Sequence, residues 1–150
     1  MSKRRVVVTG LGLITPVGIG VKESWANIIN GQSGIGKITK FDCSTFPSQV
    51  AGEVKNFDPL SCIAPKDARR MDTFIQFGIA AGIEAFKDSG IEVTDSNSER
   101  IGVSVGSGIG GINLIESTSD IFDEGGVRKD RKSTRLNSSH SQQFRMPSSA

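Results

Sequence analysis

The spacing of hydrophobic residues changes several times along the chain, and each change predicts a different element of secondary structure. A β-branched run over residues 5–9, closed by Gly10, predicts a strand buried on both faces. Apolar residues at helical spacing over residues 21–29 predict a short helix that ends at Gly31. Glycines and prolines then divide residues 31–59 into turns and short extended pieces, so we expect little helix there.

A long amphipathic stretch follows these turns. From about residue 66 to residue 87, apolar residues recur every three or four positions, which predicts the longest helix of the chain and a buried one. Gly78 and Gly82 lie inside it, although glycine costs about 1 kcal/mol relative to alanine in a helix interior. They suggest that another element approaches the helix backbone closely. Residues 88–90, Asp-Ser-Gly, predict its end.

A second strand is predicted at residues 101–105, where apolar residues alternate with small ones. It leads directly into a glycine-rich turn at residues 106–111, and a further helix is expected over residues 112–122. Strands and helices therefore alternate along the sequence, which predicts a layered α/β protein with parallel strands.

The last part of the chain follows none of these patterns. Residues 130–150 contain six Ser and few apolar residues, which predicts a disordered tail, because too little apolar surface is available to offset the entropy of ordering. We further expect this tail to be non-native, the read-through of a cloning segment joined in frame. The expected organisation is therefore one domain over residues 1–129 and a tail over residues 130–150.

Charge and composition narrow the function classes. The 150 residues carry a net charge of +2, but residues 1–129 hold 14 Lys or Arg against 15 Asp or Glu, so the basic excess belongs to the tail. A nearly neutral body gives no basic face of the kind that binds nucleic acid. No apolar run approaches the roughly 18 residues of a membrane span, and no cleavage site or transit peptide is visible at the start. We expect a cytoplasmic protein without a nucleic-acid or membrane partner.

Candidate catalytic groups are few. The chain has no Tyr, two cysteines, Cys43 and Cys62, and a single histidine, His140, which lies in the tail. Two cysteines at this spacing match neither a disulfide framework nor a metal-binding motif. Neither thiol has a histidine in residues 1–129 that could activate it. We therefore expect no catalytic residue and no metal site in this chain.

The glycine-rich turn at residues 106–111 formally matches G-x-G-x-x-G, the sequence of dinucleotide-binding turns. Taken literally, it indicates a nucleotide-dependent oxidoreductase. The acidic residues Asp123 and Glu124 lie 17 and 18 positions after Gly106, but they follow a predicted helix instead of the strand that would bring a carboxylate to the ribose. The other interpretation is a glycine-rich turn that permits tight packing.

Two basic clusters are visible on charge alone. Lys66, Arg69 and Arg70 lie at the start of the long predicted helix, and Arg128 and Lys129 lie before the tail. Clusters of this size are usually solvated faces, so composition by itself does not make either one a binding site.

Three separated segments carry a resemblance to a known family: MSKRRVVVTGLGLITPVG, KDARRMDTFIQFGIAAGIEAFKDSG and ERIGVSVGSGIGG. In order and spacing they resemble the N-terminal part of the type II β-ketoacyl-acyl-carrier-protein synthases, over residues 1–129. The resemblance implies the thiolase-like layered fold, here an incomplete N-terminal half, in an enzyme that is usually a homodimer. It also implies decarboxylative condensation of acyl and malonyl-carrier-protein in fatty-acid elongation, with no cofactor.

The resemblance carries three implications for individual residues. The family's catalytic cysteine and histidines lie beyond Lys129, so we expect this chain alone to be inactive. Ile109 matches a residue of the acyl-chain pocket. Five basic residues match the surface that binds the acyl carrier protein: Lys66, Arg69, Arg70, Arg128 and Lys129. Two alternatives remain open, a nucleotide-dependent oxidoreductase domain and a non-catalytic carrier-protein-binding module.

Overall fold

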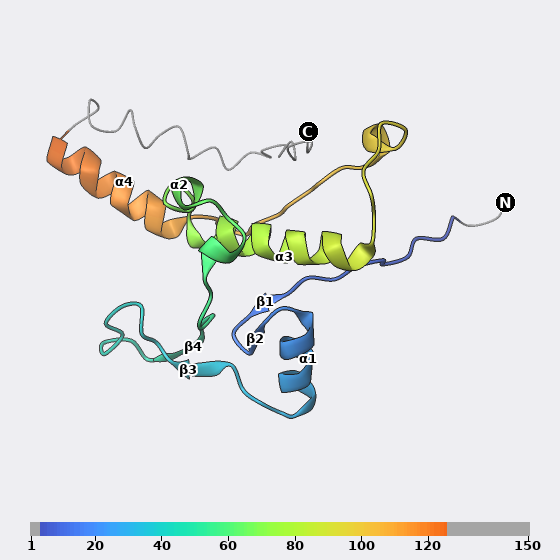
Figure 1. Cartoon of the computed structure of the whole chain (residues 1–150). Coiled ribbons are helices and arrows are strands. Elements are labelled where there is room, and N and C mark those ends of the chain that lie inside the picture. The colour runs from blue at the N-terminus through green and yellow to red at the C-terminus, as the bar shows by residue number, and fades with distance from the viewer. Residues whose placement is uncertain (1–3, 126–150) are drawn as a thin grey trace. The chain divides into compact units, whose positions relative to one another are not determined.

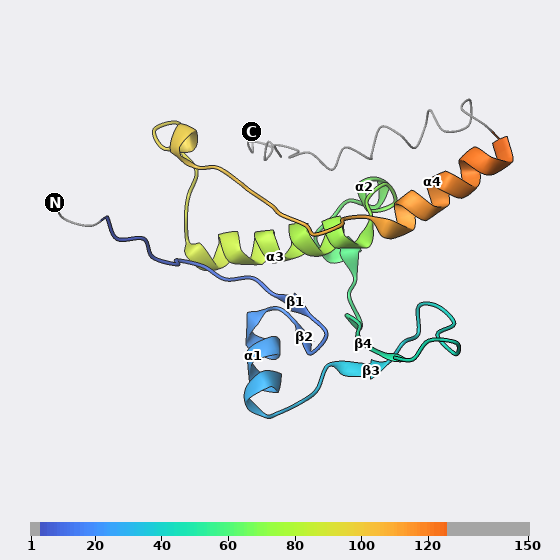
Figure 2. The same ribbon diagram turned by 180° about the vertical axis from the view of Figure 1, so that it is seen from behind.

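The computed structural model describes residues 4–125 (Figure 1). Its elements make a mixed α/β protein (Figure 2). In chain order they are β1 (Ile14–Thr15), β2 (Gly18–Ile19), α1 (Val21–Ile29), β3 (Ile35–Lys37), β4 (Val50–Gly52), the 3-10 helix η1 (Pro59–Ser61), α2 (Pro65–Ala68), α3 (Thr73–Ser89), the 3-10 helix η2 (Ser98–Arg100) and α4 (Ile112–Gly125).

Two compact units divide the described residues. Unit 1 comprises the residues up to Ile63 together with Ile79–Ile91. Unit 2 comprises Ala64–Gly78 together with the residues from Glu92 onward. The helix α3 begins in unit 2 and ends in unit 1, so each unit is built from two separate stretches of the chain.

β1 and β2 form an antiparallel hairpin in unit 1. Ile14 pairs with Ile19, and Thr15 pairs with Gly18. The hydroxyl oxygens of Thr15 and Ser24 lie 2.9 Å apart, and Ser24 Oγ donates to the Gly18 carbonyl at 3.0 Å. Ser24 belongs to α1 and is fully buried. These hydrogen bonds therefore hold α1 against the hairpin. Hydroxyl groups make this buried contact, where apolar side chains would be usual.

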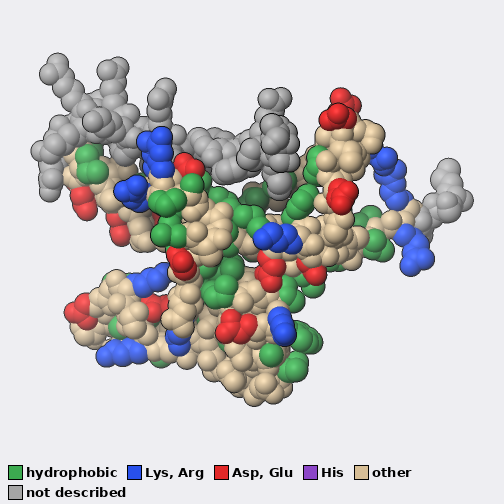
Figure 3. Space-filling view, in the orientation of Figure 1, with side chains coloured by type: hydrophobic (Ala, Val, Ile, Leu, Met, Phe, Trp, Pro, Cys, Tyr) green, Lys and Arg blue, Asp and Glu red, His purple; other side chains and the backbone are tan. Residues whose placement is uncertain are grey.

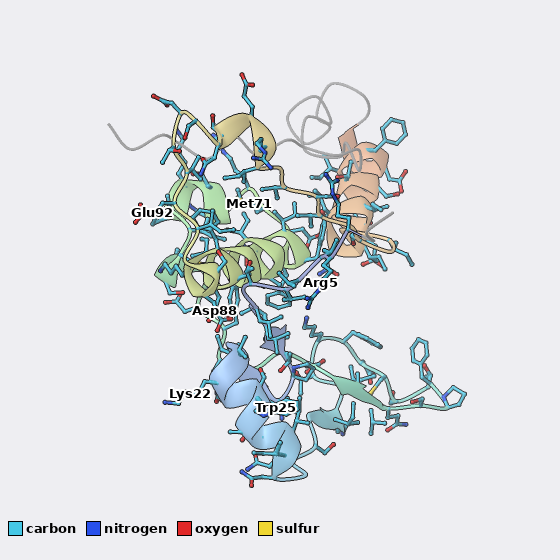
Figure 4. All side chains as sticks on the ribbon, turned by 90° about the vertical axis from the view of Figure 1, so that its right-hand side faces the viewer. Arg5, Lys22, Trp25, Met71, Asp88 and Glu92 are labelled. Carbon is cyan, nitrogen blue, oxygen red and sulfur yellow. The ribbon has the colours of Figure 1, made fainter. Side chains whose placement is uncertain are left out.

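Two carboxylates of α3 hold the same part of the chain. Glu84 Oε2 accepts the Leu13 N–H at 2.9 Å, and Glu84 Oε1 accepts the Val21 N–H at 2.8 Å. One turn further along α3, Asp88 accepts the Leu11 N–H at 2.9 Å (Figure 4). Val21 is the first residue of α1, where a backbone N–H has no acceptor inside its own helix. Glu84 therefore caps α1 from a different helix.

Another segment packs closely against the backbone of α3, but not at Gly78 and Gly82, from which such a contact was predicted. A Cβ at Gly12, in the loop before β1, would overlap the Ala81 carbonyl oxygen. Within α3, a Cβ at Gly82 would have no neighbour among the described residues within 4 Å, and one at Gly78 would make an ordinary contact with Val105 at 3.9 Å. A Cβ at Gly10 would likewise overlap the Ala85 carbonyl oxygen, so the glycines that permit the close approach belong to the segment before β1.

β3 and β4 form a second antiparallel pair, in which Gly36 lies opposite Ala51. Just after β4, Glu53 accepts the Thr39 hydroxyl at 2.7 Å, the Thr39 N–H at 3.1 Å and the Lys40 N–H at 3.3 Å. The hydrogen bond from the Thr39 hydroxyl is the largest cause that holds the pKa of Glu53 below its usual value. The charged carboxylate thus joins the two strand ends.

The prediction of strands at residues 5–9 and 101–105 is wrong, because neither segment pairs with another described segment. Val6 is 90% exposed and Val105 is 72% exposed, so the expected burial is absent as well. A strand is defined by a partner that accepts and donates along its backbone, and residues 4–125 supply none to either segment. The two strand pairs of the structure are antiparallel, which also corrects the prediction of parallel strands.

The single long helix predicted from residue 66 is interrupted. α2 ends at Ala68 and α3 begins at Thr73. Asp72 starts the new helix, because its Oδ1 accepts the Thr73 N–H at 2.6 Å and its carbonyl accepts the Gln76 N–H at 3.2 Å. None of the α3 residues is fully buried, so the helix is only partly covered and the prediction of a buried helix is wrong.

Helix ends follow the sequence more faithfully. α1 ends at Ile29, and Gly31 soon after it has a φ of +68°. α3 ends at Ser89 and is followed by Gly90 with a φ of +62°. Glycine adopts such left-handed backbone without strain, so both ends are confirmed where a glycine predicted them. The predicted start of the last helix at Ile112 is confirmed too.

Few side chains are buried among the described residues. The buried side chains are Ser24, Cys43, Ile63 and Ala68. Hydrophobic side chains are visible at several separate places on the face in Figure 3, and Trp25 on α1 is 61% exposed (Figure 4). Within residues 4–125, none of the helices combines the length and the apolar character that a membrane crossing requires. The predicted domain boundary at Lys129 lies outside the described residues.

Candidate functional site

The basic cluster at residues 66–70 is displayed by α2 and the two residues after it. Pro65 occupies the first position of this short helix, where a missing N–H is no loss. Ala68 is buried and anchors the segment. Lys66, Arg69 and Arg70 are all exposed, and Lys and Arg side chains are visible over α2 in Figure 3. The cluster therefore forms a positively charged surface in unit 2.

Local hydrogen bonds hold this cluster in place. Arg69 Nε donates to the Pro65 carbonyl at 3.1 Å, which directs the guanidinium back along α2. Gln76 Nε2, on α3, donates to the carbonyls of Ala68 and Met71 at 2.9 and 3.2 Å. Because these carbonyls lie where α2 has ended, Gln76 supplies the partner that the interrupted helix leaves out. The cluster is thus fixed to the first turn of α3.

The glycine-rich turn packs against the same turn of α3. A Cβ at Gly111 would overlap Asp72 Oδ2 and would lie 3.3 Å from the Phe74 ring. A Cβ at Gly110, which has a φ of +81°, would lie 3.6 Å from that ring. Ile109 itself is 74% exposed. The structure therefore brings the turn and the basic cluster to the same region of unit 2, as neighbours of Asp72.

The same geometry disfavours phosphate binding at this turn. Gly106 and Gly108 have open space around them, and the segment before them is not a strand. The Asp72 carboxylate lies beside Gly111, at the N-terminus of α4, where a phosphate would have to bind. A negative charge at that place repels a second anion. The tight-packing interpretation fits Gly110 and Gly111.

Residues 4–125 contain no histidine that could activate either thiol. Cys43 is buried in the loop between β3 and β4. Cys62 is partly buried, with its sulfur 3.7 Å from the Pro59 carbonyl oxygen. Among the described residues, no three His, Cys, Asp or Glu side chains are grouped so that they could hold a metal ion. His140, Arg128 and Lys129 lie outside the described residues.

Sequence reasoning missed Asp72, Phe74 and Gln76. Charge and hydrophobic periodicity alone give none of these three residues a role in the site. The available signal is local: a Thr with a Gln three positions later, directly after an Asp, is a typical helix start. Recognising it would have predicted the interruption between α2 and α3.

Comparisons with known proteins agree with one another. The family model described as "Beta-ketoacyl synthase, N-terminal domain" matches residues 3–145, which extends past the boundary predicted at Lys129. The chain is 54% identical over 129 residues to the 3-oxoacyl-[acyl-carrier-protein] synthase 2 of Vibrio harveyi. That alignment covers 86% of this chain and 31% of the relative, so the chain spans about a third of the relative's length.

Solved structures give the same result. The chain superimposes on the ishigamide ketosynthase/chain length factor with a TM-score of 0.66 and 31% identity, over 88% of this chain and 32% of that chain. It superimposes on "AntDE:AntF (apo): type II PKS acyl-carrier protein in complex with its ketosynthase bound to the hexaketide" with a TM-score of 0.63 and 26% identity. The latter match covers 85% of this chain and 33% of that chain.

Proposed function

Because the chain belongs to the β-ketoacyl synthase family, we propose that it is the N-terminal part of a 3-oxoacyl-[acyl-carrier-protein] synthase of fatty-acid elongation. The observation that carries this proposal is the 54% identity with a synthase of that name over 129 residues. The complete enzyme would have the thiolase-like fold, two similar layered halves in a homodimer, of which this chain supplies part of the first.

The reaction proposed for the complete enzyme is a decarboxylative condensation. An acyl group passes from its carrier protein to a cysteine thiolate, and malonyl-carrier-protein loses carbon dioxide and attacks the resulting thioester. Two histidines would stabilise the thioester oxyanion and the developing enolate. These groups are expected beyond residue 129. The 150-residue chain alone would not catalyse the condensation, since residues 4–125 contain no histidine that could activate Cys43 or Cys62.

The proposed partner is the acyl carrier protein. Three exposed cations, Lys66, Arg69 and Arg70, lie on one short segment, and a surface of this kind attracts an acidic helix. Arg128 and Lys129, which lie outside the described residues, are proposed to contact the same partner. The solved ketosynthase in complex with its acyl-carrier protein supports a partner of this class. Attraction between exposed charges should weaken as the ionic strength rises.

The proposed acyl-chain pocket includes Ile109. Its side chain is 74% exposed in unit 2, and the turn that carries it is held by Asp72 and Phe74. An exposed apolar side chain on a well-fixed turn is suited to line a pocket that further protein completes. The dimer partner and the second half of the enzyme are the proposed source of that protein.

A chimera tests the proposal. Residues 1–129 replace the aligned segment of the Vibrio harveyi synthase 2, and condensation of acyl- and malonyl-carrier-protein is measured for the chimera, the parent enzyme and the 150-residue chain. We expect activity within about tenfold of the parent for the chimera and none for the chain alone. A folded chimera without activity would contradict the proposal.

The matched control replaces both cysteines of the transplanted segment. The chimera with Cys43→Ala and Cys62→Ala should keep the activity of the unmodified chimera, because the proposed nucleophile lies in the Vibrio part. Loss of activity in this variant, with folding intact, would show that one of these thiols takes part in the reaction.

The two other hypotheses predict different results. A nucleotide-dependent oxidoreductase domain would bind NAD(P), which the Asp72 carboxylate at the N-terminus of α4 disfavours. A non-catalytic carrier-protein-binding module would bind the carrier protein through Lys66, Arg69 and Arg70 while its gene carries no downstream catalytic residues. Sequencing the source DNA across codons 125 to 150 and onward separates this module from a truncated synthase.

A further inference from the structure

Asp72 has a carboxylate oxygen that the described structure leaves without a hydrogen bond. Its Oδ1 accepts the Thr73 N–H at 2.6 Å, whereas its Oδ2 is buried and has no hydrogen-bond partner among the described residues. A buried carboxylate oxygen in this state costs stability unless something nearby compensates it. The neighbours of Oδ2 therefore indicate why an acidic residue is retained here.

The nearest neighbour of Oδ2 is the end of the glycine-rich turn. A Cβ at Gly111 would overlap Oδ2, so a side chain there would displace the carboxylate, and the Phe74 ring lies 3.6 Å from the Cβ position of Gly110 and 3.3 Å from that of Gly111. Gly111 immediately precedes Ile112, the first residue of α4. The N-terminus of a 14-residue helix carries a partial positive charge, which compensates a carboxylate placed beside it. Asp72 thus holds the turn by charge and by shape.

Asp72 is also part of the structure that fixes the basic cluster. Its carbonyl accepts the Gln76 N–H, and the Gln76 side chain holds the carbonyls that follow α2. In sequence, Asp72 lies two positions after Arg70, and Gly111 lies two positions after Ile109. One residue therefore connects the exposed cations with the turn that carries the exposed isoleucine.

We propose that Asp72 is a positioning residue: it holds the turn of residues 106–111, and through it Ile109, at a fixed place relative to Lys66, Arg69 and Arg70. This inference rests on the proposed function. A carrier protein that docks on the cations would then deliver its acyl chain toward a turn whose place Asp72 sets. Asp72 would influence which acyl-chain lengths are used, without contacting the chain itself.

The first test measures the turn directly. Backbone hydrogen exchange of residues 106–112 is followed by mass spectrometry in the chimera described above and in its Asp72→Ala and Asp72→Asn variants. We expect Asp72→Ala to raise the exchange rate of this segment about tenfold, with a smaller increase for Asp72→Asn, which keeps the shape and loses the charge. The matched control is Asp67→Asn, which removes an exposed acidic charge from α2 and should leave the segment unchanged. Equal exchange in all four proteins would overturn the inference.

The second test measures selectivity. In Asp72→Ala, the ratio of kcat/KM between long and short acyl-carrier-protein substrates should change about fivefold or more, while the KM for the carrier protein stays within about twofold. An equal loss at every chain length would assign Asp72 a purely structural role and would overturn the inference. If the chimera is inactive, the exchange measurement still decides about Asp72, and only the proposed function fails.

Discussion

Glu84, near the middle of α3, accepts the N–H of Val21 at the first position of α1, across 63 residues of sequence. Gly20 precedes Val21 and has no side chain that could cap α1. Glu84 thus supplies both the hydrogen-bond acceptor and the negative charge that a helix N-terminus favours. Its other oxygen, bound to the Leu13 N–H, ties the β1–β2 hairpin to the same carboxylate.

Replacing Glu84 should therefore destabilise unit 1. Glu84→Ala leaves two backbone N–H groups without their acceptor, and we expect the free energy of unfolding to fall by about 1–3 kcal/mol in a urea titration of the chain. Lys87→Ala is the matched control, because Lys87 is exposed on the same helix. Equal effects of the two substitutions would contradict the capping role of Glu84.

Two glycines should respond oppositely to the same substitution. Gly12→Ala should destabilise the protein by about 1–3 kcal/mol, because the added methyl group would overlap the Ala81 carbonyl oxygen. Gly82→Ala should stabilise it by up to about 1 kcal/mol, because a methyl group there meets open space within a helix. Thermal unfolding of both variants measures the difference, and a destabilised Gly82→Ala would refute the second expectation.

Charge reversal tests the basic cluster. In the chimera, Arg69→Glu together with Arg70→Glu should raise the KM for the acyl carrier protein about tenfold and reduce its dependence on salt, with kcat within about twofold. Lys22→Glu, which reverses an exposed cation on α1 in unit 1, is the control and should leave the KM unchanged (Figure 4). An unchanged KM in the double variant would remove the cluster from the proposed docking surface.

Acid should weaken the contact between the ends of β3 and β4. The pKa of Glu53 is lower in the folded chain than its usual value, chiefly through the Thr39 hydroxyl. Its contribution to stability is therefore present above the unfolded pKa and is lost as the pH falls through the folded one, from about pH 5 toward pH 3. Glu53→Gln should flatten this part of the curve of urea midpoint against pH.

The partner gives an independent check of the same effect. Thr39→Val removes the hydroxyl that Glu53 accepts while it keeps the Thr39 N–H in place. It should weaken the acid dependence only in part. If Thr39→Val and the unmodified chain lose stability identically between pH 5 and pH 3, the hydroxyl does not lower the pKa of Glu53.

The C-terminal ends of α1 and α3 were predictable from sequence because they depend on neighbouring residues, whereas the break between α2 and α3 was not predicted. Gly31 and Gly90 end α1 and α3 through a backbone conformation that glycine itself favours. The strands were not predictable, because residues 5–9 and 101–105 have strand-like composition but a strand requires a partner from elsewhere. Mixed α/β character could be inferred, whereas the pairing could not.

The candidate site, too, could be predicted from the sequence only in part. The exposure of Lys66, Arg69 and Arg70 follows from their charge, so a surface cluster could be predicted. Its connection to the glycine-rich turn could not, because the contact of Asp72 with Gly111 joins residues 39 positions apart. The amino-acid composition does not indicate which residues far apart in the sequence come into contact.

The interleaving of the two units has a consequence for folding. Unit 1 requires Ile79–Ile91, and the stretch between its two parts, Ala64–Gly78, belongs to unit 2. No single cut in the chain separates them, so a protease that cleaves between Ile63 and Ile79 breaks both. The Glu84 hydrogen bonds also close loops of 63 and 71 residues, which slows their formation relative to local helices. The hairpin and α1 should consequently gain their final protection late, after α3 has formed.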